Sequence, residues 1–263
     1  MRITRSVTMV SAVTIAVVAV ACTSSGSNKT ASPTPAGPNV TAAAASATSP
    51  VSVHLTWSAS GANGGTLYKI TRNGSSVADV STTVYEDTGL DPKTTYQYSV
   101  AAVDAKGHVS TAATASATTP ALPPISQARL QGRGHVLEKY TSVVGITNIA
   151  PGKKQREIWV FKPHCDTGAC NTLMKLFRPG SSPTTLHRKG ASYNGTFHDN
   201  LGRCNGTTVH ENYTLHITVT KGSYANGEWR ATKFKGTLSE SAPPQGGCVG
   251  TSTKQTVTGS ISV

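Results

Sequence analysis

The sequence predicts an all-β protein with about two folded domains. Charged and aromatic residues make up only 14% and 6% of the 263 residues, whereas Gly and Pro number 25 and 14, which favours short strands and turns over amphipathic helices. Apolar and polar residues alternate in short runs over 39–120 and again over 129–263, and no helical periodicity is sustained. The length suits about two domains of ordinary size.

The first segment, 1–21, has the pattern of an export signal. Arg2 and Arg5 precede an uncharged run that is too short for a bilayer span of about 20 residues. The run ends in Ala-Val-Ala before Cys22, and this tetrapeptide resembles a bacterial lipobox. The resemblance implies a signal peptide over 1–21 and a lipid anchor on Cys22; an ordinary cleaved secretory signal is the alternative.

Residues 22–38 are predicted to be a disordered stalk. They are mostly Ser, Thr, Pro, Gly and Ala, and almost no large apolar side chain is present to offset the entropy of ordering. Such a segment would hold folded domains clear of a membrane surface.

Residues 39–120 have the strand and turn spacing of a β-sandwich. The clearest predicted strands cover 51–57, 68–72 and 94–103. Asn73 and Gly74 directly follow the second of these. Asn-Gly predicts a type I′ hairpin turn, because both central residues of that turn need positive φ.

This stretch resembles a fibronectin type III domain over its whole length. Trp57 falls where that family keeps its core tryptophan. Leu90, Pro92 and Tyr96 match the family's tyrosine corner, Leu-x-Pro-x-Thr-x-Tyr. The resemblance implies an Ig-like sandwich in which the Tyr96 hydroxyl bonds to nearby backbone, and it implies structural roles for these residues without chemistry.

Residues 121–128 are Pro-rich and predict a stiff linker, and 129–263 predicts a second antiparallel β-domain. Its predicted strands cover 136–144, 157–162, 173–177, 184–187, 209–220, 229–237 and 255–263. About seven or eight such strands must close into a barrel or stack as a sandwich to protect their edges. Both arrangements stay open.

The order of motifs in the second domain resembles a module of secreted actinobacterial proteins. The motifs are 159–165, a short cysteine loop, 193–197, Cys204 and 234–237. The resemblance implies an extracellular, actinobacterial-type setting and no mechanism.

Four cysteines remain once Cys22 is assigned to lipid. An even number in an exported chain predicts two disulfides. We prefer Cys165 with Cys170, which closes a short loop, and Cys204 with Cys248, which would join distant strands. A zinc site is the alternative, although the spacing fits no common zinc motif.

The positive charge is concentrated in the second domain. The formal net charge of the chain is +12. From residue 121 onward there are 17 Lys and Arg and 7 Asp and Glu, a net charge of 17 − 7 = +10. Residues 38–120 contain 4 Lys and Arg and 5 Asp and Glu, a net charge of 4 − 5 = −1. A basic surface attracts polyanions in a salt-dependent way. The alternative is that these cations only keep the domain soluble.

The sequence shows no recognisable catalytic or metal-binding motif. A nucleophile elbow, a Walker loop and a zincin helix are absent from it. No pair of histidines in the second domain has helical metal-site spacing, and His198 and Asp199 are expected in a loop with diverging side chains. These histidines are His135, His164, His187, His198, His210 and His216. We therefore predict no catalytic residue, no metal and no cofactor.

Two tryptophans and the carboxylates leave one alternative open. Trp159 and Trp229 lie near glutamates and could form a sugar platform, but are better explained as core anchors of a small β-domain. With only seven carboxylates in the domain, a two-carboxylate glycosidase would need the fold to bring two of them together.

We hypothesise a non-enzymatic surface lipoprotein at the extracellular face of a Gram-positive type membrane. The basic domain would bind an anionic wall polymer, a glycan or a lipid ligand, and the type III domain would be a spacer or scaffold. Nucleic acid is disfavoured as a partner, and the oligomeric state is open. The alternative is an accessory or catalytic component of extracellular polysaccharide degradation.

Overall fold

The computed structural model describes residues 37–177 and 182–262, and for 200–204 it describes the backbone alone. The predicted signal peptide, Cys22 and nearly all of the predicted stalk lie outside the described residues. Over the described ranges the chain forms fifteen strands and one short 3-10 helix, which confirms the predicted all-β class.

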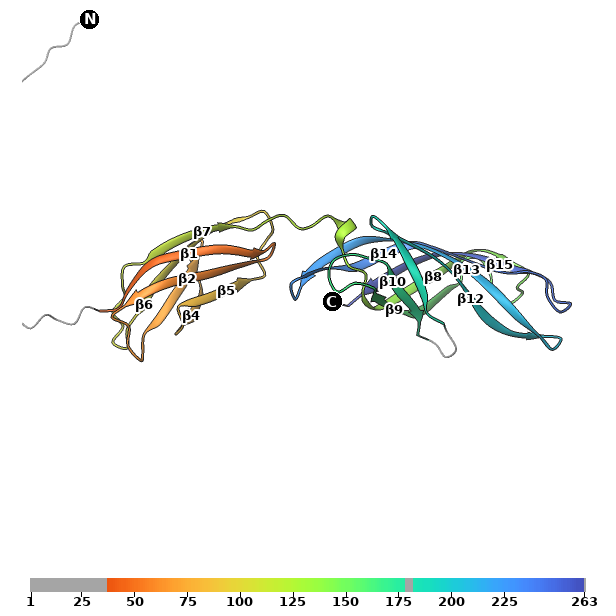
Figure 1. The fold of residues 1–263 in the computed structure, drawn as a ribbon, viewed down its shortest axis with the longest axis horizontal. Coiled ribbons are helices and arrows are strands. Elements are labelled where there is room, and N and C mark those ends of the chain that lie inside the picture. The colour runs from red at the N-terminus through yellow and green to blue at the C-terminus, as the bar shows by residue number, and fades with distance from the viewer. Residues whose placement is uncertain (1–36, 178–181, 263) are drawn as a thin grey trace, which may run out of the picture. The chain divides into compact units, whose positions relative to one another are not determined.

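Residues 39–118 form two antiparallel sheets (Figure 1), with strand orders β1-β2-β5 and β4-β3-β6-β7. The strands are β1 Asn39–Ser49, β2 Ser52–Ser60, β3 Leu67–Arg72, β4 Ser75–Val80, β5 Val84–Thr88, β6 Thr95–Val103 and β7 Ala113–Thr118. Asn73 and Gly74 have φ values of 50° and 81°, so the β3–β4 hairpin has the two positive-φ residues predicted for Asn-Gly.

Aromatic residues of both sheets fill the core of this sandwich. Trp57 on β2 meets Tyr68 on β3 edge to face, with ring centroids 5.4 Å apart. Trp57, Leu90 and Tyr96 are buried. The Tyr96 hydroxyl accepts a 2.8 Å hydrogen bond from the backbone N–H of Asp91, which forms the tyrosine corner. Pro92 is half-buried beside it.

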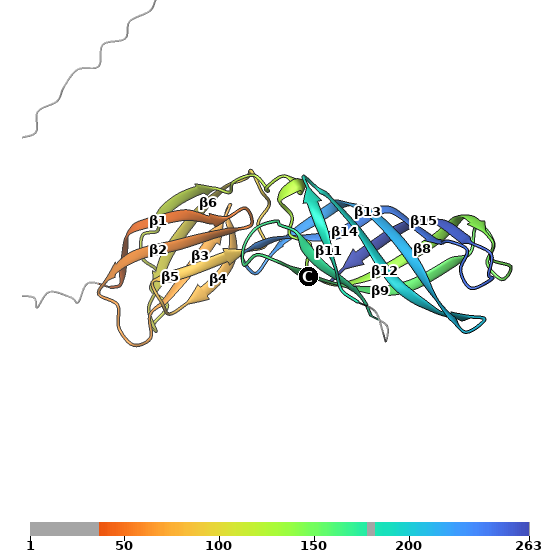
Figure 2. The same cartoon turned by 45° about the vertical axis from the view of Figure 1, so that its right-hand side comes forward.

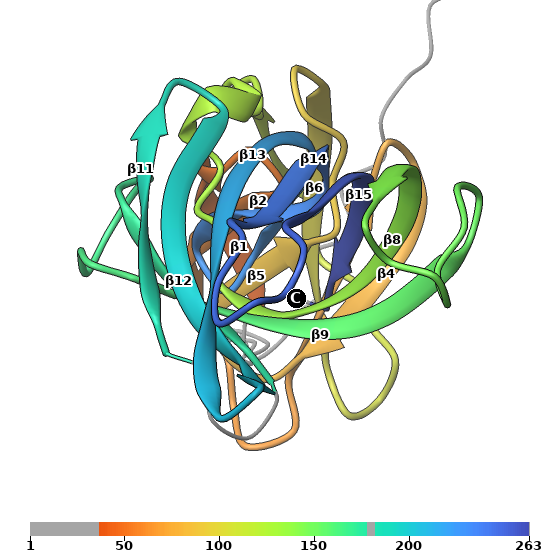
Figure 3. The ribbon, with the colours of Figure 1, turned by 90° about the vertical axis from the view of Figure 1, so that its right-hand side faces the viewer.

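Residues 132–261 form a closed barrel of eight antiparallel strands. The strands are β8 Gly132–Val144, β9 Lys154–Pro163, β10 Thr172–Leu176, β11 Thr184–Lys189, β12 Ser192–Cys204, β13 Thr207–Ala225, β14 Glu228–Ala242 and β15 Thr251–Ile261. Each strand pairs with the next along the chain, and β15 pairs back with β8. Figure 3 shows the resulting ring. Of the two arrangements left open, the chain adopts the barrel, in which every strand pairs with a neighbour on each side.

In the barrel the sequence prediction missed one strand. β12 pairs with β13 along its whole length (Figure 2), and it contains His198 and Asp199, which were expected in a loop. Several Asn and Gly residues in β12 hide its alternation, and pairing with the long β13 outweighs their low strand propensity. The other predicted strands are present, with ends shifted by a few residues.

The predicted linker 121–128 ends earlier than expected, because its second half packs on the barrel. The 3-10 helix η1, Ile125–Gln127, places Ile125 against the barrel core, and Ala128 is buried within that core. Arg129 then pairs with β14: its N–H donates to Trp229 O and its carbonyl accepts from the N–H of Ala231, both at 2.9 Å. The barrel domain therefore begins within the Pro-rich segment.

The predicted Cys165–Cys170 disulfide is present and closes the loop between β9 and β10. Cys248 is also disulfide-bonded. The side chain of Cys204, its predicted partner, lies outside the described residues, so that pairing stays a prediction.

Candidate functional site

The outer face of five adjacent barrel strands is strongly basic. Along each strand every second side chain points outward. On β14, β15, β8, β9 and β10, nine of the domain's 17 Lys and Arg residues are outward-facing and exposed. They are Arg133, Lys139, Lys154, Arg156, Lys162, Lys175, Lys233, Lys235 and Lys254. We name this surface the basic wall. Arg129 and Arg230, which form ion pairs with Glu228, do not belong to this wall.

The carboxylates of the same strands face the barrel interior. Glu138 adjoins Lys139 and Glu157 adjoins Arg156, yet both glutamates line an internal cavity. The pleat of each strand sends neighbouring residues to opposite sides. On these strands the exposed cations therefore lie outside and Glu138 lies inside, whereas Glu157 borders both the inner pocket and the outer groove.

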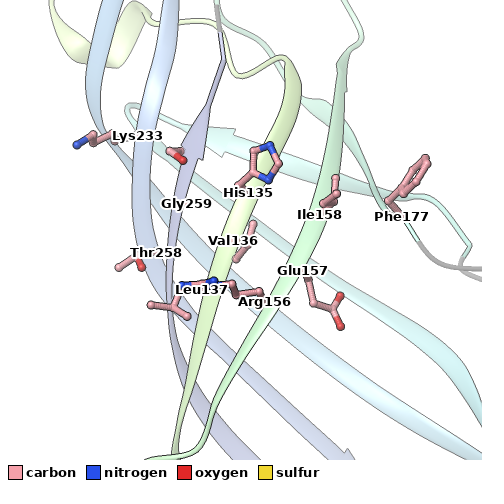
Figure 4. Close-up of a pocket in the computed structure, with 11 residues that line it drawn as sticks. His135, Val136, Leu137, Arg156, Glu157, Ile158, Phe177, Lys233, Thr258 and Gly259 are labelled. Carbon is pink, nitrogen blue, oxygen red and sulfur yellow. The ribbon is translucent and has the colours of Figure 1, made fainter.

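A groove of about 740 Å³ lies on the basic wall, across β9, β8, β15 and β14 (Figure 4). Its charged and imidazole groups are those of His135, Arg156, Lys233 and one carboxylate, Glu157. Leu137 and Ile158 supply apolar surface between them. Phe177 stands at one side, where Figure 4 shows its ring away from the other labelled residues. The ring is 62% exposed, and the Arg133 guanidinium lies 4.5 Å from its centroid. The groove combines cations with an apolar strip.

The internal cavity measures about 340 Å³ and is lined by Glu138, Glu157, Glu211 and Glu240 together with two tyrosines. Hydrogen bonds hold the carboxylates in place. Gln155 Nε2 donates to Glu157 at 2.6 Å, Gln255 Nε2 donates to Glu240 at 2.7 Å, and the Tyr213 hydroxyl donates to Glu211. These glutamates make further interactions as well. Their side chains are thus engaged in the barrel's own polar network.

The carboxylate cluster affects the titration of Tyr140, which also lines the cavity. Burial raises the pKa of Tyr140 to about 12 from an ordinary value of about 10, and the charges of Glu240, Glu138, Glu157 and Glu211 add to the rise. Its hydroxyl donates to Gln155 Oε1 at 3.4 Å.

This shift predicts an alkaline sensitivity of the barrel. Between about pH 10 and about pH 12, Tyr140 keeps its proton in the folded state and loses it in the unfolded state, so the stability present below pH 10 is lost as the pH rises. We expect the free energy of unfolding of the wild type to fall more steeply over this window than that of Tyr140→Phe. Urea unfolding of both proteins at matched pH values measures the difference. Equal slopes would contradict the prediction.

The histidines do not come together as a metal site. Among the described residues there is no cluster of three or more His, Cys, Asp or Glu side chains that could hold a metal ion. His198 pairs with Asn212 at 2.6 Å across β12 and β13, and His216 pairs with Asn194. Both are cross-strand pairs on the outer surface.

The two tryptophans proposed as core anchors have different surroundings. Trp159 is fully buried, and its ring stacks against Phe234 with centroids 6.0 Å apart. Trp229 is only half-buried, and its indole N–H donates to Pro124 O at 3.2 Å. Trp159 is therefore unavailable to a ligand, whereas part of Trp229 is accessible.

Sequence reasoning missed the grouping of the four glutamates. The signal was present, because Glu138 shares strand parity with Val136 and Tyr140, and Glu211 shares it with Tyr213. Which glutamates meet, however, depends on barrel closure, which the sequence left open.

Comparisons with known proteins concern the sandwich. Residues 33–118 match the family described as Fibronectin type III domain. Chitinase D of Niallia circulans is 49% identical over 69 residues, which cover 26% of this chain and 13% of that protein. An alpha-amylase of the same organism is 39% identical over 103 residues, which cover 38% of this chain and 8% of that protein. A poly(3-hydroxybutyrate) depolymerase of Ralstonia pickettii is 42% identical over 85 residues, which cover 32% of this chain and 17% of that protein.

The chain thus spans less than a fifth of the length of these relatives, and the matches are to their type III modules. Among solved structures, a Yersinia enterocolitica family 28 exopolygalacturonase aligns over 37% of this chain and 22% of its own at 19% identity, with a TM-score of 0.30, too low to support an inference. In the described part of the chain no helix has the length and apolarity needed to cross a bilayer. Sequence match, strand order and tyrosine corner agree: residues 33–118 are a fibronectin type III domain.

Proposed function

We propose that this protein is a non-enzymatic binding protein of the bacterial envelope, whose basic wall holds an anionic polymer outside the cell. The observation that carries the proposal is the separation of charge across the barrel wall. Nine exposed cations lie on five adjacent strands, and of the glutamates on these strands that could neutralise them, Glu138 and Glu240 point inward, whereas Glu157 borders both the inner pocket and the groove.

The spacing of the cations suits a polymer with repeated charges. Neighbouring strands lie about 5 Å apart, and side chains two residues apart on one strand lie about 7 Å apart. A chain crossing β9, β8, β15 and β14 along the groove would meet a cation at Arg156 and another at Lys233, with apolar surface between them. The outside of a barrel presents a curved strip, which favours an extended chain over a flat lipid surface.

The remaining parts of the chain fit a tethered binding protein. The type III domain would act as a spacer, and its relatives carry the names of enzymes that degrade polymers. Cys22 would carry the lipid, and the stalk 22–38 would lead to the folded domains. The Cys165–Cys170 disulfide supports an oxidising compartment.

Charge neutralisation in the groove tests the proposal. We expect the triple variant Arg133→Gln, Arg156→Gln, Lys233→Gln to bind poly(glycerol phosphate) about 100- to 200-fold more weakly at low salt, because each surface cation contributes roughly 1 kcal/mol. Wild-type affinity should fall steadily as salt is raised from about 0.05 M to about 0.5 M. Retention of the full chain on immobilised polymer measures both effects.

The matched control removes three exposed cations elsewhere, Lys69→Gln, Lys189→Gln and Lys221→Gln, and should change affinity less than about threefold. Equal loss in the two triple variants would mean that net charge alone attracts the polymer. Binding that is as strong to neutral dextran, or binding to phosphatidylglycerol vesicles without binding to the polymer, would overturn the proposal.

The acidic cavity favours one alternative, a polysaccharide hydrolase, because paired carboxylates are the catalytic groups of glycosidases. The hydrogen bonds that engage these glutamates support a structural role instead. Release of reducing ends from polygalacturonate or peptidoglycan by wild type, abolished by Glu157→Gln, would establish the hydrolase.

A further inference from the structure

A second pocket, about 530 Å³ in volume, lies at the barrel end opposite the acidic cavity. The acidic cavity is lined by the β8–β9 turn, whereas this pocket is lined by the next loop, between β9 and β10, and successive loops of an antiparallel barrel alternate between its ends. We name it the end pocket. Its three walls are 123–129, the disulfide loop 165–170, and the β13–β14 hairpin around Tyr224 and Trp229.

One side of the end pocket is held by a buried arginine. Arg129 donates to the carbonyls of Cys165 and Asp166, and its Nη1 lies 3.1 Å from Glu228. Glu228 is further engaged by Arg230 at 2.8 Å and by Gln131 at 3.2 Å. The Glu228 carboxylate therefore already accepts hydrogen bonds from three side chains of the barrel domain.

Arg188 brings a second guanidinium to the same pocket. Its side chain donates a hydrogen bond to Ser126 O and also interacts with the Tyr193 hydroxyl, and its own backbone N–H donates to Asn171 Oδ1 at 2.8 Å. The buried Nε–H of Arg129 has no acceptor among the described residues. Two guanidinium groups and one carboxylate, which is already bonded to three donors, give the pocket a net positive charge.

The opposite side of the end pocket is aromatic. Trp229 and Tyr224 face each other across the β13–β14 ladder and both line the pocket. The Trp229 ring is fixed by its hydrogen bond to Pro124 O and by close packing over Gly222, where an added Cβ would lie 2.8 Å from the ring. A fixed aromatic surface and the Arg188 guanidinium therefore line the same pocket.

We propose that the end pocket binds a carboxylate-bearing sugar unit. The planar guanidinium of Arg188, which lines the pocket, matches a carboxylate in bidentate geometry. Trp229 or Tyr224 presents an aromatic face to the apolar side of the sugar ring. A pocket of this volume suits a ligand of one or two rings. This site uses neither the basic wall nor the groove, so it goes beyond the proposed function.

Titration of the full chain with D-glucuronate, with D-glucose as the neutral analogue, tests the site. We expect saturable binding of glucuronate and at least about tenfold weaker binding of glucose, because a charge-assisted hydrogen bond contributes about 1.5–3 kcal/mol. Arg188→Gln should weaken glucuronate binding at least about tenfold. Tyr224→Ser should also weaken it, because it removes an aromatic face that would contact the sugar ring. Isothermal titration calorimetry measures all of these affinities.

Lys189→Gln is the matched control, because this neighbouring cation is exposed and does not line the pocket. It should leave glucuronate affinity within about twofold, as should the groove triple variant, which separates this site from the polymer interface. The proposal is overturned if glucuronate shows no saturable binding, if glucose or acetate binds equally well, or if Lys189→Gln acts like Arg188→Gln. Tyr224→Ser decides the outcome if Arg188→Gln does not fold.

Discussion

Replacing Phe234 by alanine is expected to lower the free energy of unfolding of the barrel by about 3–5 kcal/mol. Phe234 is 2% exposed, and its ring lies 5.5 Å from that of Phe161 and 6.0 Å from that of Trp159, centroid to centroid. Truncation would remove these contacts and leave a cavity in the centre of the core. Denaturant unfolding followed by far-UV circular dichroism measures the loss.

The matched control is the same substitution at Phe177, whose ring is 62% exposed. Phe177→Ala should change the free energy of unfolding by less than about 0.5 kcal/mol. Similar losses in both variants would mean that the ring cluster does not stabilise the barrel.

Gly259 provides an independent check of the same packing. A Cβ at this position would lie 2.1 Å from Phe234 Cζ, so Gly259→Ala should destabilise the barrel by overpacking, about 1–3 kcal/mol or more. In a double variant, Phe234→Leu should recover part of the stability lost in Gly259→Ala, because leucine is smaller than phenylalanine and leaves room for the added Cβ. Strictly additive losses would contradict the packing described here.

The sandwich was predictable from the sequence because its signals are local. Asn-Gly sets the β3–β4 turn through its own backbone preferences, and the tyrosine corner places Tyr96 within five residues of its hydrogen-bond donor, Asp91. In the barrel, alternation identified most strands, but β12 was missed because its partner strand rather than its own composition determines its conformation. Closure of the ring depends on the pairing of β15 with β8, which no local pattern encodes.

The candidate sites differ in the same way. Excess positive charge after residue 121 was evident, and strand parity could have placed Lys139 outside and Glu138 inside. The end pocket could not be predicted, because Arg129, Arg188 and Trp229 come from the segment before β8, from β11 and from β14. Arg188 and Lys189 are adjacent basic residues in the sequence, and only the fold distinguishes the one that lines a pocket.

Arg129→Met is expected to lower the free energy of unfolding of the barrel by about 3–5 kcal/mol. The Arg129 side chain is only 10% exposed, and its guanidinium bonds to two carbonyls of the disulfide loop and to Glu228. Methionine would fill much of the volume, but it would leave those carbonyls without their donor and Glu228 with one ion-pair partner fewer. Denaturant unfolding of the oxidised protein measures the loss.

Arg156→Met controls for the removal of one arginine, because Arg156 is exposed on the basic wall and should change stability by less than about 0.5 kcal/mol. Adding Glu228→Gln to Arg129→Met should recover part of the loss, since the carboxylate then no longer needs a cationic partner. If Arg129→Met is as mild as Arg156→Met, the buried guanidinium does not organise the disulfide loop. The end pocket would then lack the rigid wall on which its proposed ligand depends.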